Sequence, residues 1–563
     1  MLVLGIHTLT HDTCAALVEN GRLIFAVEEE RLRGVKHTEA FPELAIQACL
    51  RFRNITMKDI DAVAVSYDPV KIIRDKIFGH HSSYLPDSMP RLSADLLFAN
   101  RLAGYEQEIR QTMNYDGDIY FCHHHTAHFA SSYLVSRFDE SALFSIDGCG
   151  DFESAMIGFG QKNSVSVFDD YCIRYPQSLG FLYTTMTGHL GFLRNCDEGK
   201  VMGLAPYGNP ATFDSLFEDI VTLKPEGRFD INMDYFLYQY RKNVGFSKKL
   251  EDAAGPQRIP GSQITQRHRD LAAAVQLWTE KVMLHVCNYL HDRTQCPNLS
   301  MAGGVSLNCV ANGRILAETP FKRIFIQPAA NDAGTAIGAA LYYYYSRETG
   351  APRHPIDHAY LGNAYRDEEI EAILNGKGLR YTLPRNLTEQ LAGFMKDGRI
   401  IGWFSGRMEI GPRALGNRSI LTAPFPAEMK DILNSKVKHR EPFRPFAPIV
   451  RLDECGDYFE FDHESPYMLL AYRVRDERVQ DVPAITHVDG TARVQTVTRD
   501  QNNEIYELIS EFKRQTGVGV ILNTSFNVMG QPIVETPEIA IDCFMGTQMD
   551  YLVFNNRYLV EKQ

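Results

Sequence analysis

Two stretches of the chain share one order of apolar and polar positions. In each, a short apolar run leads through a polar loop to a second apolar run, and a turn then leads to a third. Short apolar runs bounded by turn residues such as Asn20-Gly21 are typical of β-strands joined in hairpins. The repeated order therefore predicts a duplicated architecture. The runs are residues 2–5, 15–18 and 23–27 in the first stretch, and 143–146, 155–159 and 165–168 in the second.

A glycine-rich segment follows the second stretch. The apolar run 299–302 ends at Gly303 and Gly304, and a helix is predicted through Asn312 and Ile315. Glycines at such a strand-to-helix turn let backbone amides approach a nucleotide at the positive end of the helix dipole. Together with the duplicated unit, this pattern resembles the actin, hexokinase and Hsp70 superfamily, in which two related lobes surround a nucleotide cleft. The alternative is two unrelated hairpins in a mixed fold.

The rest of the pattern predicts two α/β domains. Residues 271–290 form a long amphipathic or largely buried helix, whereas 60–115 is mainly helical after Pro90 and 209–265 is mixed and rich in loops. The polar segment 346–358, with two prolines and a glycine, marks a domain boundary. We therefore expect an N-terminal domain of residues 1–350 and a C-terminal α/β domain of residues 351–563.

Composition excludes some function classes and favours others. The 563 residues are 44% hydrophobic and 23% charged, which is typical of a globular protein. A net charge of -12 disfavours nonspecific binding to nucleic acid or anionic membranes. The 11 cysteines include no CxxC pair, so reduced thiols are expected. The N-terminus lacks the features of a signal peptide, and no apolar run matches a membrane span, so a cytoplasmic location is expected.

Four histidines are concentrated in residues 122–133. On a helix, His124 and His128 lie one turn apart on the same face, where two imidazoles can reach one metal ion. His123 and His125 would point elsewhere, to orient the ligands or to do nothing. The alternative is a polar helix end whose histidines cap carbonyls or face water.

The C-terminal domain contains an excess of positive charge. Three arginines lie in the glycine-containing segment 406–419, and residues 434–451 hold five basic residues against one acidic residue. Arginine and lysine of this kind bind phosphate oxygens. A solvated basic face is the common alternative, but Arg444 lies among prolines and phenylalanines. Residues 521–527 add hydroxyl and amide donors, although Ser and Asn at strand ends are often only turn formers.

These residues resemble the motifs of the O-carbamoyltransferases, a family that includes the nodulation-factor, cephalosporin and tobramycin carbamoyltransferases. The resemblance covers both predicted domains, except for the insertions 60–115 and 209–265. The matching runs are His11-Asp12, Glu28-Glu29-Glu30-Arg31, Lys36-His37, His124-xxx-His128, 198–208 (EGKVMGLAPYG), 302–308 (AGGVSLN), 411–419 (GPRALGNRS), 443–448 (FRPFAP) and 522–527 (LNTSFN).

The resemblance implies an enzyme with two reaction sites. A YrdC-like C-terminal domain would form carbamoyl adenylate from carbamoyl phosphate and ATP, with Mg as the nucleotide's counterion. A Kae-like N-terminal domain of the actin type would transfer the carbamoyl group to a hydroxyl of a small natural-product acceptor. The implied metal ligands are His124, His128, Asp147 and Asp332, with Fe(II) as the expected ion. Manganese or zinc also suits two imidazoles and two carboxylates.

The resemblance also assigns roles to residues outside the metal site. His11, held by Asp12, would be the general base or would orient the acceptor hydroxyl, and its alternative is an Asx-type turn. Lys36 would lie near the adenylate, and its alternative is a surface lysine. Asp332 would otherwise be only a helix N-cap. The implied nucleotide and substrate ligands are Lys36, Gly303, Gly304, Asn308, Arg407, Arg413, Arg418, Lys438, Arg444, Arg493, Asn523 and Ser525.

Two other functions compete with this interpretation. A threonylcarbamoyl-type transferase acting on tRNA shares the paired histidines, but no basic surface run outside the expected active site suits a tRNA. A nonenzymatic nucleotide-binding regulator would have lost motifs that are all present here. The acceptor is not encoded in any recognisable motif, and we expect the insertions 60–115 and 209–265 to line its pocket. A homodimer is an expectation of the same kind.

Overall fold

The computed structural model describes residues 1–79, 89–240 and 245–562, with the side chains of residues 89–92 left out. The chain divides into two compact units. The first contains residues 1–26 and 39–356, and the second contains residues 27–38 and 357–563. The sequence placed all of 1–350 in one domain, whereas the contacts of residues 27–38 lie with the C-terminal unit.

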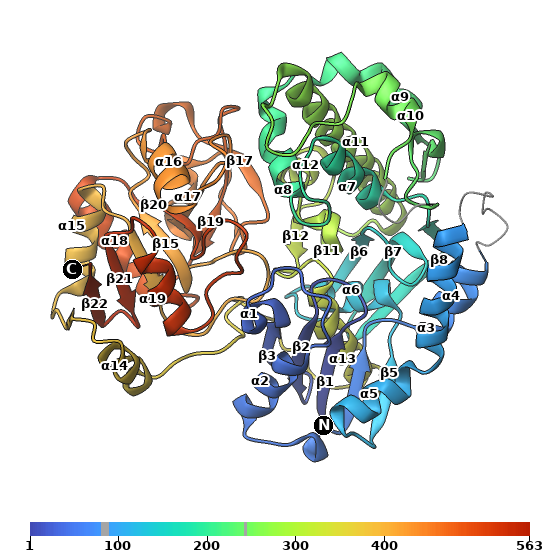
Figure 1. Ribbon diagram of the computed structural model, residues 1–563, viewed down its shortest axis with the longest axis horizontal. Helices are drawn as coiled ribbons and strands as arrows, with labels where there is room; N and C mark the ends of the chain where they lie inside the picture. The colour runs from blue at the N-terminus through green and yellow to red at the C-terminus, as the bar shows by residue number, and fades with distance from the viewer. Residues whose placement is uncertain (80–88, 241–244, 563) are drawn as a thin grey trace. The chain divides into compact units, whose positions relative to one another are not determined.

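The first unit contains two five-stranded sheets with the same plan (Figure 1). In each sheet, the first strand pairs antiparallel with the next strand of the chain and parallel with a strand that arrives after a helical crossover. The duplicated architecture is confirmed, and the fold of this unit is α/β. The first sheet has the order β3-β2-β1-β4-β5, built from β1 (Leu2–His7), β2 (Cys14–Glu19), β3 (Arg22–Glu28), β4 (Ala62–Val65) and β5 (Asp118–Phe121). The second has the order β8-β7-β6-β11-β12, built from β6 (Glu140–Ile146), β7 (Glu153–Gln161), β8 (Ser164–Arg174), β11 (Asn298–Ala302) and β12 (Arg323–Ile326).

Two helices, α6 (His124–Tyr133) and α13 (Ala333–Arg347), pack against one another between the sheets. Two glycines allow this approach. A Cβ at Gly338 of α13 would lie 1.7 Å from the carbonyl oxygen of Ala127 in α6. A Cβ at Gly5 of β1 would lie 1.9 Å from the carbonyl oxygen of Ala336 in α13. Because any side chain at these positions would push the elements apart, the two glycines set the distance between the histidine helix, β1 and the start of α13.

The predicted insertions are present in the first unit. Residues 60–115 are mainly helical, as predicted, although residues 80–88 lie outside the described part of the chain. Residues 209–265 are mixed and loop-rich, as predicted, with 241–244 outside the description. The predicted long helix is α11 (Gln266–Thr294). The helices of the insertions are α3 (Pro69–Lys71), η2 (Ile72–Phe78), α4 (Met89–Ala103), α5 (Tyr105–Met113), η6 (Pro210–Phe213), α9 (Asp214–Ile220), η7 (Met233–Tyr235) and α10 (Lys248–Ala254).

The remaining elements of the first unit cover the sheets or connect their strands. They are α2 (Glu43–Arg53), η1 (Met57–Asp59), α7 (Leu179–His189), α8 (Glu198–Leu204), η5 (Ala205–Tyr207), the ribbon β9 (Val221–Leu223) and β10 (Phe229–Ile231), η8 (Gly304–Leu307) and α12 (Cys309–Glu318). All eleven cysteines of the chain are free thiols. Within the described ranges, the structure contains no helix with the length and apolar character needed to cross a bilayer.

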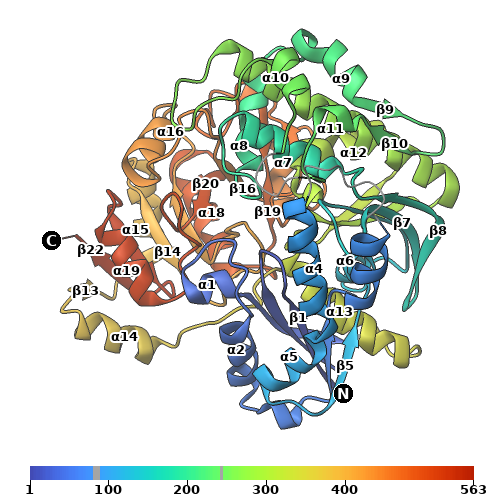
Figure 2. The same ribbon diagram turned by 45° about the vertical axis from the view of Figure 1, so that its right-hand side comes forward.

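The second unit is built on one mixed eight-stranded sheet, with α15, α18 and α19 packed beside it (Figure 2). Its strand order is β13-β22-β21-β14-β15-β20-β16-β19. The strands are β13 (Tyr381–Thr382), β14 (Ile401–Phe404), β15 (Arg418–Thr422), β16 (Ala447–Arg451), β19 (Gln495–Val497), β20 (Val520–Ser525), β21 (Tyr551–Phe554) and β22 (Tyr558–Glu561). A separate ribbon pairs β17 (Ala471–Arg473) with β18 (Thr491–Arg493).

The helices of the second unit begin with a segment from the N-terminal part of the chain, α1 (Glu29–Arg33). The helices are α14 (Asp367–Gly376), α15 (Leu387–Lys396), α16 (Met429–Ile432), η9 (Leu433–Val437), η10 (Leu452–Glu454), α17 (Cys455–Tyr458), η11 (Asp476–Arg478), α18 (Asn503–Thr516) and α19 (Pro537–Met545).

Candidate metal centre and arginine-rich site

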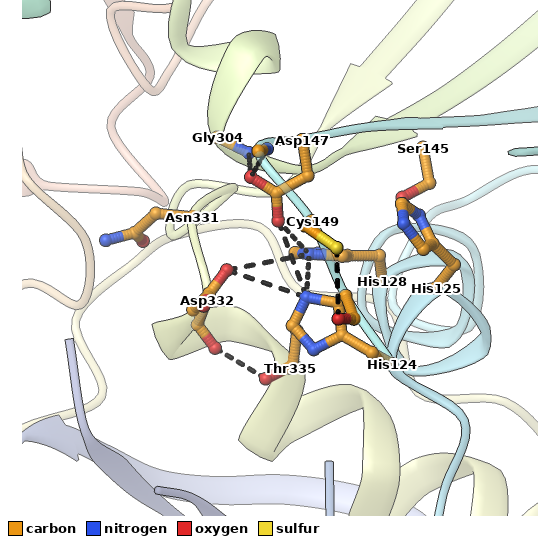
Figure 3. Close-up of polar contacts among 12 residues, drawn as sticks. His124, His125, His128, Ser145, Asp147, Cys149, Gly304, Asn331, Asp332 and Thr335 are labelled. Atoms are coloured by element: carbon orange, nitrogen blue, oxygen red, sulfur yellow. Dashed lines mark hydrogen bonds and ion pairs between the residues drawn. The ribbon is translucent and has the colours of Figure 1, made fainter. Parts of the chain in front are cut away.

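Four side chains from distant parts of the first unit meet at the start of α6. His124 and His128 are fully buried on one face of this helix and point toward Asp147, at the end of β6, and Asp332, before α13 (Figure 3). The two Nε2 atoms lie 3.1 Å apart. Asp147 Oδ2 lies 3.4 and 3.2 Å from the Nε2 atoms of His124 and His128. Asp332 Oδ1 lies 3.6 and 3.9 Å from the same atoms.

These separations fit a single metal ion. Bonds of about 2.0–2.2 Å in a tetrahedral arrangement place neighbouring ligand atoms roughly 3.4 Å apart. One ligand atom from each of the four residues lies within 4.8 Å of the other three. Two imidazoles and two carboxylates can bind iron(II), manganese or zinc, so the donor set suits a divalent cation without selecting one.

The outer atoms of the two carboxylates are also bound. Asp147 Oδ1 accepts hydrogen bonds from the backbone N–H groups of Gly148 (2.7 Å) and Gly304 (3.2 Å). Asp332 Oδ2 accepts from the hydroxyls of Thr10 (3.1 Å) and Tyr67 (3.3 Å). Each carboxylate therefore keeps one oxygen in the cluster, with its orientation fixed by the other. The N-cap position of α13 is Asp332, but its side chain makes no capping hydrogen bond.

One of the two histidines, His124, is oriented in the same way. His124 Nδ1 lies 3.2 Å from the carbonyl oxygen of Ser66, so Nδ1–H is the donor and the Nε2 lone pair faces the cluster. Burial acts to lower the pKa of His124, but Asp332 and Asp147 raise it well above its ordinary value. Burial lowers the pKa of His128. Two buried carboxylates thus require positive charge close by, which a cation would supply directly.

The other two histidines of the segment do not enter the cluster. His125 points away and binds Ser145 Oγ through Nδ1 at 2.7 Å (Figure 3). His123 Nε2 lies 3.0 Å from Glu153 Oε2 and 2.5 Å from Lys71 Nζ. Both therefore connect α6 to neighbouring strands, as the helical spacing predicted for side chains on other faces.

Sequence reasoning missed three residues around the cluster. His7 at the end of β1 is fully buried, and its Nε2 lies 3.5 Å from Asp332 Oδ2. Tyr67, just after β4, stacks on His124 with ring centroids 4.4 Å apart. Ser66 provides the carbonyl that binds His124. The signal that could have found them is positional, because β1 and β4 are parallel neighbours whose carboxyl ends meet at one edge of the sheet.

The predicted catalytic pair lies beside this site. His11 Nδ1 is 3.0 Å from Asp12 Oδ2, and the same oxygen accepts a hydrogen bond from Asn331, next to Asp332. The His11 side chain is 37% exposed, so an entering molecule can reach it. Burial acts to lower the pKa of His11, but the hydrogen bond and charge of Asp12 raise it to about 9. A proton-accepting role needs the neutral ring, which positive charge in the adjacent cluster favours.

The glycine segment contributes backbone to the same site. Gly303 has a φ of 98°, which only glycine adopts readily, and a Cβ there would lie 2.2 Å from the carbonyl oxygen of Ile146. This conformation lets Gly304 N–H reach Asp147. The side chain of Asn308 is buried, where it caps α12 through Ala311 N and bonds to Gln276.

The second unit contains a buried lysine. Lys438 Nζ donates to Ser525 O at 2.7 Å, Asn527 O at 2.7 Å and Asn527 Oδ1 at 2.6 Å, and it lies 3.1 Å from Ser525 Oγ. Burial, followed by the charges of Arg440, Arg444 and Lys36, lowers its pKa well below the ordinary value. The structure therefore brings together Lys438, Ser525 and Lys36, and it adds Asn527, which was quoted only as part of a motif.

Further arginines surround this lysine. Arg440 is close enough to Arg444 and Arg493 that, after burial, their charges lower its pKa well below the ordinary value. Glu441 offers one nearby carboxylate, with its Oε2 3.9 Å from Arg444 Nη1. Such a concentration of positive charge around a buried lysine is costly, and an anionic group such as a phosphate would offset it.

Arg407 and Arg418 lie in a different setting. Arg418 is fully buried, donates to the carbonyls of Ser405 and Gly406, and places its guanidinium 3.6 Å from the centre of the Phe404 ring. Arg407 donates to the carbonyls of Leu361 and Gly362. In this structure both side chains hold backbone together, whereas Arg413 lies on the loop that connects them.

A cavity of about 490 Å³ lies beside the histidine helix in the first unit. Lys71 and Asp75 of the first insertion line it, together with side chains of β7 and β8. Lys71 and Glu153 belong to its wall and also bind His123, the neighbour of His124.

Known proteins match the chain over most of its length. The family model described as Carbamoyltransferase N-terminus matches residues 2–341, and that described as Carbamoyltransferase C-terminus matches residues 392–562. A protein of Synechocystis named Uncharacterized protein sll1178 is 40% identical over 99% of this chain and 96% of its own length.

Two relatives have names that describe a process or a reaction. The nodulation protein NolNO of Sinorhizobium fredii is 38% identical over 99% of this chain and 80% of its own length. The 3'-hydroxymethylcephem-O-carbamoyltransferase of Amycolatopsis lactamdurans is 32% identical over 71% of this chain and 70% of its own length. The chain belongs to the carbamoyltransferase family and is a transferase enzyme.

Proposed function

We propose that the protein is an ATP-dependent O-carbamoyltransferase. In this proposal the YrdC-like domain, residues 351–563, forms carbamoyl adenylate from carbamoyl phosphate and MgATP. The Kae-like domain, residues 1–350, transfers the carbamoyl group to a hydroxyl of a small natural-product acceptor. The observation that carries the proposal is the pair of sites with opposite electrostatic character, one acidic with two imidazoles and one strongly basic, within a carbamoyltransferase chain.

The first half-reaction needs positive charge around phosphates. One water molecule hydrolyses carbamoyl phosphate to carbamate and inorganic phosphate, and a carbamate oxygen then attacks the α-phosphorus of ATP while pyrophosphate leaves with the electrons of the broken P–O bond. Negative charge accumulates on the phosphate oxygens during this displacement, and fixed cations stabilise it. Lys438, Arg444 and Arg493 are grouped around Arg440 in a manner that supports this role. Arg413 completes the proposed set.

The second half-reaction needs a nucleophile and a good leaving group. The acceptor hydroxyl attacks the carbamoyl carbon, its proton passes to a base, and AMP leaves with the bonding electrons of the broken C–O bond. We assign the base or orienting role to His11, which Asp12 holds through Nδ1. Gly303 and Gly304 would lie against the nucleotide, as glycines at strand-to-helix turns allow.

We propose Fe(II) as the ion held by His124, His128, Asp147 and Asp332, with manganese or zinc as competitors. A bound cation would supply positive charge for an adenylate phosphate or for the carbamoyl oxygen. Thr10, Tyr67 and Ser66 would keep the ligands in place whether or not substrate is present. Native-protein mass spectrometry and elemental analysis identify the ion without any assay of activity.

The cavity beside Lys71 and Glu153 is our candidate for acceptor binding. It contains charged groups of both signs, with Asp75, Asp169 and Arg174 in its wall, and such a lining suits a polar, hydroxyl-bearing molecule. Asp169→Asn should change which hydroxyl compounds gain a carbamoyl group, as followed by mass spectrometry. Pyrophosphate release should stay the same. An unchanged acceptor profile would exclude this cavity.

The decisive experiment supplies ATP and carbamoyl phosphate separately and together. Pyrophosphate should appear only with both, and mass spectrometry of candidate hydroxyl metabolites should show one added carbamoyl group. Carbamoyl label that enters tRNA and no small alcohol would instead establish the threonylcarbamoyl-type alternative. A protein that binds nucleotide without releasing pyrophosphate under any condition would be a regulator.

A further inference from the structure

The loop 411–418, called the arginine loop here, carries Arg413. Side chains from other parts of the second unit form hydrogen bonds with several of its backbone N–H and carbonyl groups. Glu409 Oε1 accepts hydrogen bonds from the N–H groups of Leu415 (2.8 Å), Asn417 (2.7 Å) and Arg418 (3.1 Å). One carboxylate oxygen thus fixes the loop on the C-terminal side of Arg413.

Two amide side chains hold the middle of the same loop. Asn523 Nδ2 donates to the carbonyl oxygen of Ala414 at 3.0 Å and to Gln495 Oε1 at 3.0 Å. Gln495 Nε2 in turn donates to the carbonyl oxygen of Leu415 at 2.7 Å. Asn523 and Gln495 are almost fully buried, so these bonds form away from water.

The other end of the arginine loop is bound by the N-terminal segment of the second unit. Glu28 Oε1 accepts a hydrogen bond from Gly411 N–H at 2.8 Å, and Arg31 donates through Nη2 to the carbonyl oxygen of Gly411 at 2.8 Å. The two side chains lie 3.4 Å apart and are 6% and 2% exposed. Both polar groups of a single glycine are therefore held by residues more than 300 positions earlier in the chain.

Contacts at Gly411 affect the direction in which the backbone continues toward Arg413. The φ of Gly411, 97°, lies in the region that favours glycine, and Pro412 then fixes the next φ near -65°. With these two dihedral angles restricted, fewer rotations separate Gly411 from Arg413, so the orientation of Gly411 influences where Arg413 leaves the backbone. Contacts that hold both the N–H and the carbonyl of Gly411 thus hold the base of the Arg413 side chain.

Arg31 also connects the two ends of the loop electrostatically. Burial acts to lower the pKa of Arg31, but the carboxylates of Glu28, Glu30 and Glu409 raise it. The positive charge of Arg31 therefore interacts both with Glu28, which binds Gly411, and with Glu409, which binds the other end of the loop. Removing one partner of such a buried ion pair is strongly destabilising, because the remaining charge is then buried without an opposite charge beside it.

We propose that Glu28 and Arg31 are positioning residues for Arg413 in the adenylate-forming half-reaction, so that chemistry in the C-terminal unit depends on a segment encoded near the N-terminus. The inference rests on the proposed function of that unit. Glu28 and Arg31 themselves touch the glycine backbone and not the substrate, and they act through the direction of the arginine loop.

A double-mutant cycle tests this dependence. Glu28→Ala should lower kcat/KM for pyrophosphate release by about ten- to hundredfold, because a displaced binding group forfeits much of its stabilisation. Glu28→Gln keeps an acceptor oxygen for Gly411 N–H and should recover most of the activity. In an Arg413→Ala background, Glu28→Ala should have little further effect, because residues that act through one group are not additive. Glu43→Ala, an exposed change on α2, serves as the matched control.

The outcomes separate the two levels of the proposal. Wild-type protein that releases no pyrophosphate would overturn the proposed function itself. Active wild type with a folded Glu28→Ala of unchanged kcat/KM would overturn the inference alone, as would effects of Glu28→Ala and Arg413→Ala that simply multiply. If Glu28→Ala does not fold, Arg31→Lys decides by the same measurement and the same cycle. A lower kcat/KM in Arg31→Lys that disappears in the Arg413→Ala background supports the inference. A kcat/KM of Arg31→Lys equal to that of the wild type refutes it.

Discussion

The candidate metal centre of the first unit and the arginine-rich site of the second, which contains the buried Lys438, have opposite charges. The first gathers two carboxylates and two imidazoles around one point. The second gathers a lysine and several arginines around one another, with Glu441 as a nearby carboxylate. Because a protein tolerates such buried charge only when something offsets it, the first site suits a cation and the second suits an anion.

The two sites also differ in how they are held. Hydroxyl and backbone groups bind the outer atoms of Asp147, Asp332 and His124, so each of these three candidate ligands has a defined orientation. In the second unit, hydrogen bonds hold the loop backbone, as at Gly411 and Leu415, while the long side chains extend from it. This difference fits an ion of fixed coordination in one site and a larger phosphate-bearing molecule in the other.

The largest expected effect removes one partner of the first site. His128→Ala should abolish stoichiometric metal binding, because it removes one of the four candidate ligands of the ion. Elemental analysis after dialysis should fall from about one ion per chain to near zero. Carbamoyl transfer should be lost while pyrophosphate release persists. His285→Ala, which alters a histidine bound only to the carbonyl of Lys224 in the described structure, should retain the metal. Retention of metal by His128→Ala would refute the site.

The next effect breaks the second site. Arg444→Ala should lower pyrophosphate release about hundredfold or more, because a fixed cation is removed from the developing phosphate charge. Metal content should not change. Arg366→Ala removes an exposed arginine paired with Glu369 and should keep wild-type rates. Unaffected pyrophosphate release in Arg444→Ala would remove the adenylation role of this unit.

A third change separates the two reactions within one protein. His11→Asn keeps a polar group beside Asp12 but has no imidazole to orient the hydroxyl or accept its proton. Transfer should fall about hundredfold or more, within the range of general acid–base contributions, while adenylate formation remains. Pyrophosphate release and carbamoylated product should be measured in the same reaction. An equal loss of both would contradict the division of labour.

The smallest expected effect is on ligand orientation. Tyr67→Phe removes the hydroxyl that donates to Asp332 Oδ2 and preserves the ring stacked on His124. Metal affinity should weaken by about tenfold, as measured by competition with a coloured chelator. Tyr343→Phe, whose hydroxyl binds Asp118 away from the cluster, is the control. If the metal affinity of Tyr67→Phe equals that of Tyr343→Phe, the Tyr67 hydroxyl is not needed to orient Asp332.

Much of this arrangement could be predicted from local patterns, and some could not. The strand repeat and the helical spacing of His124 and His128 follow from periodicity, and both are present in the structure. His7 and Tyr67 were missed because nothing in their immediate sequence distinguishes a polar residue at a strand end from an ordinary turn residue. Their importance depends on two parallel strands ending side by side.

The sequence by itself determined the duplicated strands, the paired histidines and the concentration of positive charge, because each follows from residues close together in the chain. The family resemblance implied that His124, His128, Asp147 and Asp332 share one ion, and the tertiary structure decided how they meet, through the close approaches at Gly5 and Gly338. It alone also placed residues 27–38 in the second unit, where Glu28 and Arg31 hold Gly411. Contacts between residues hundreds of positions apart depend on how complete elements pack, and no local pattern carries that information.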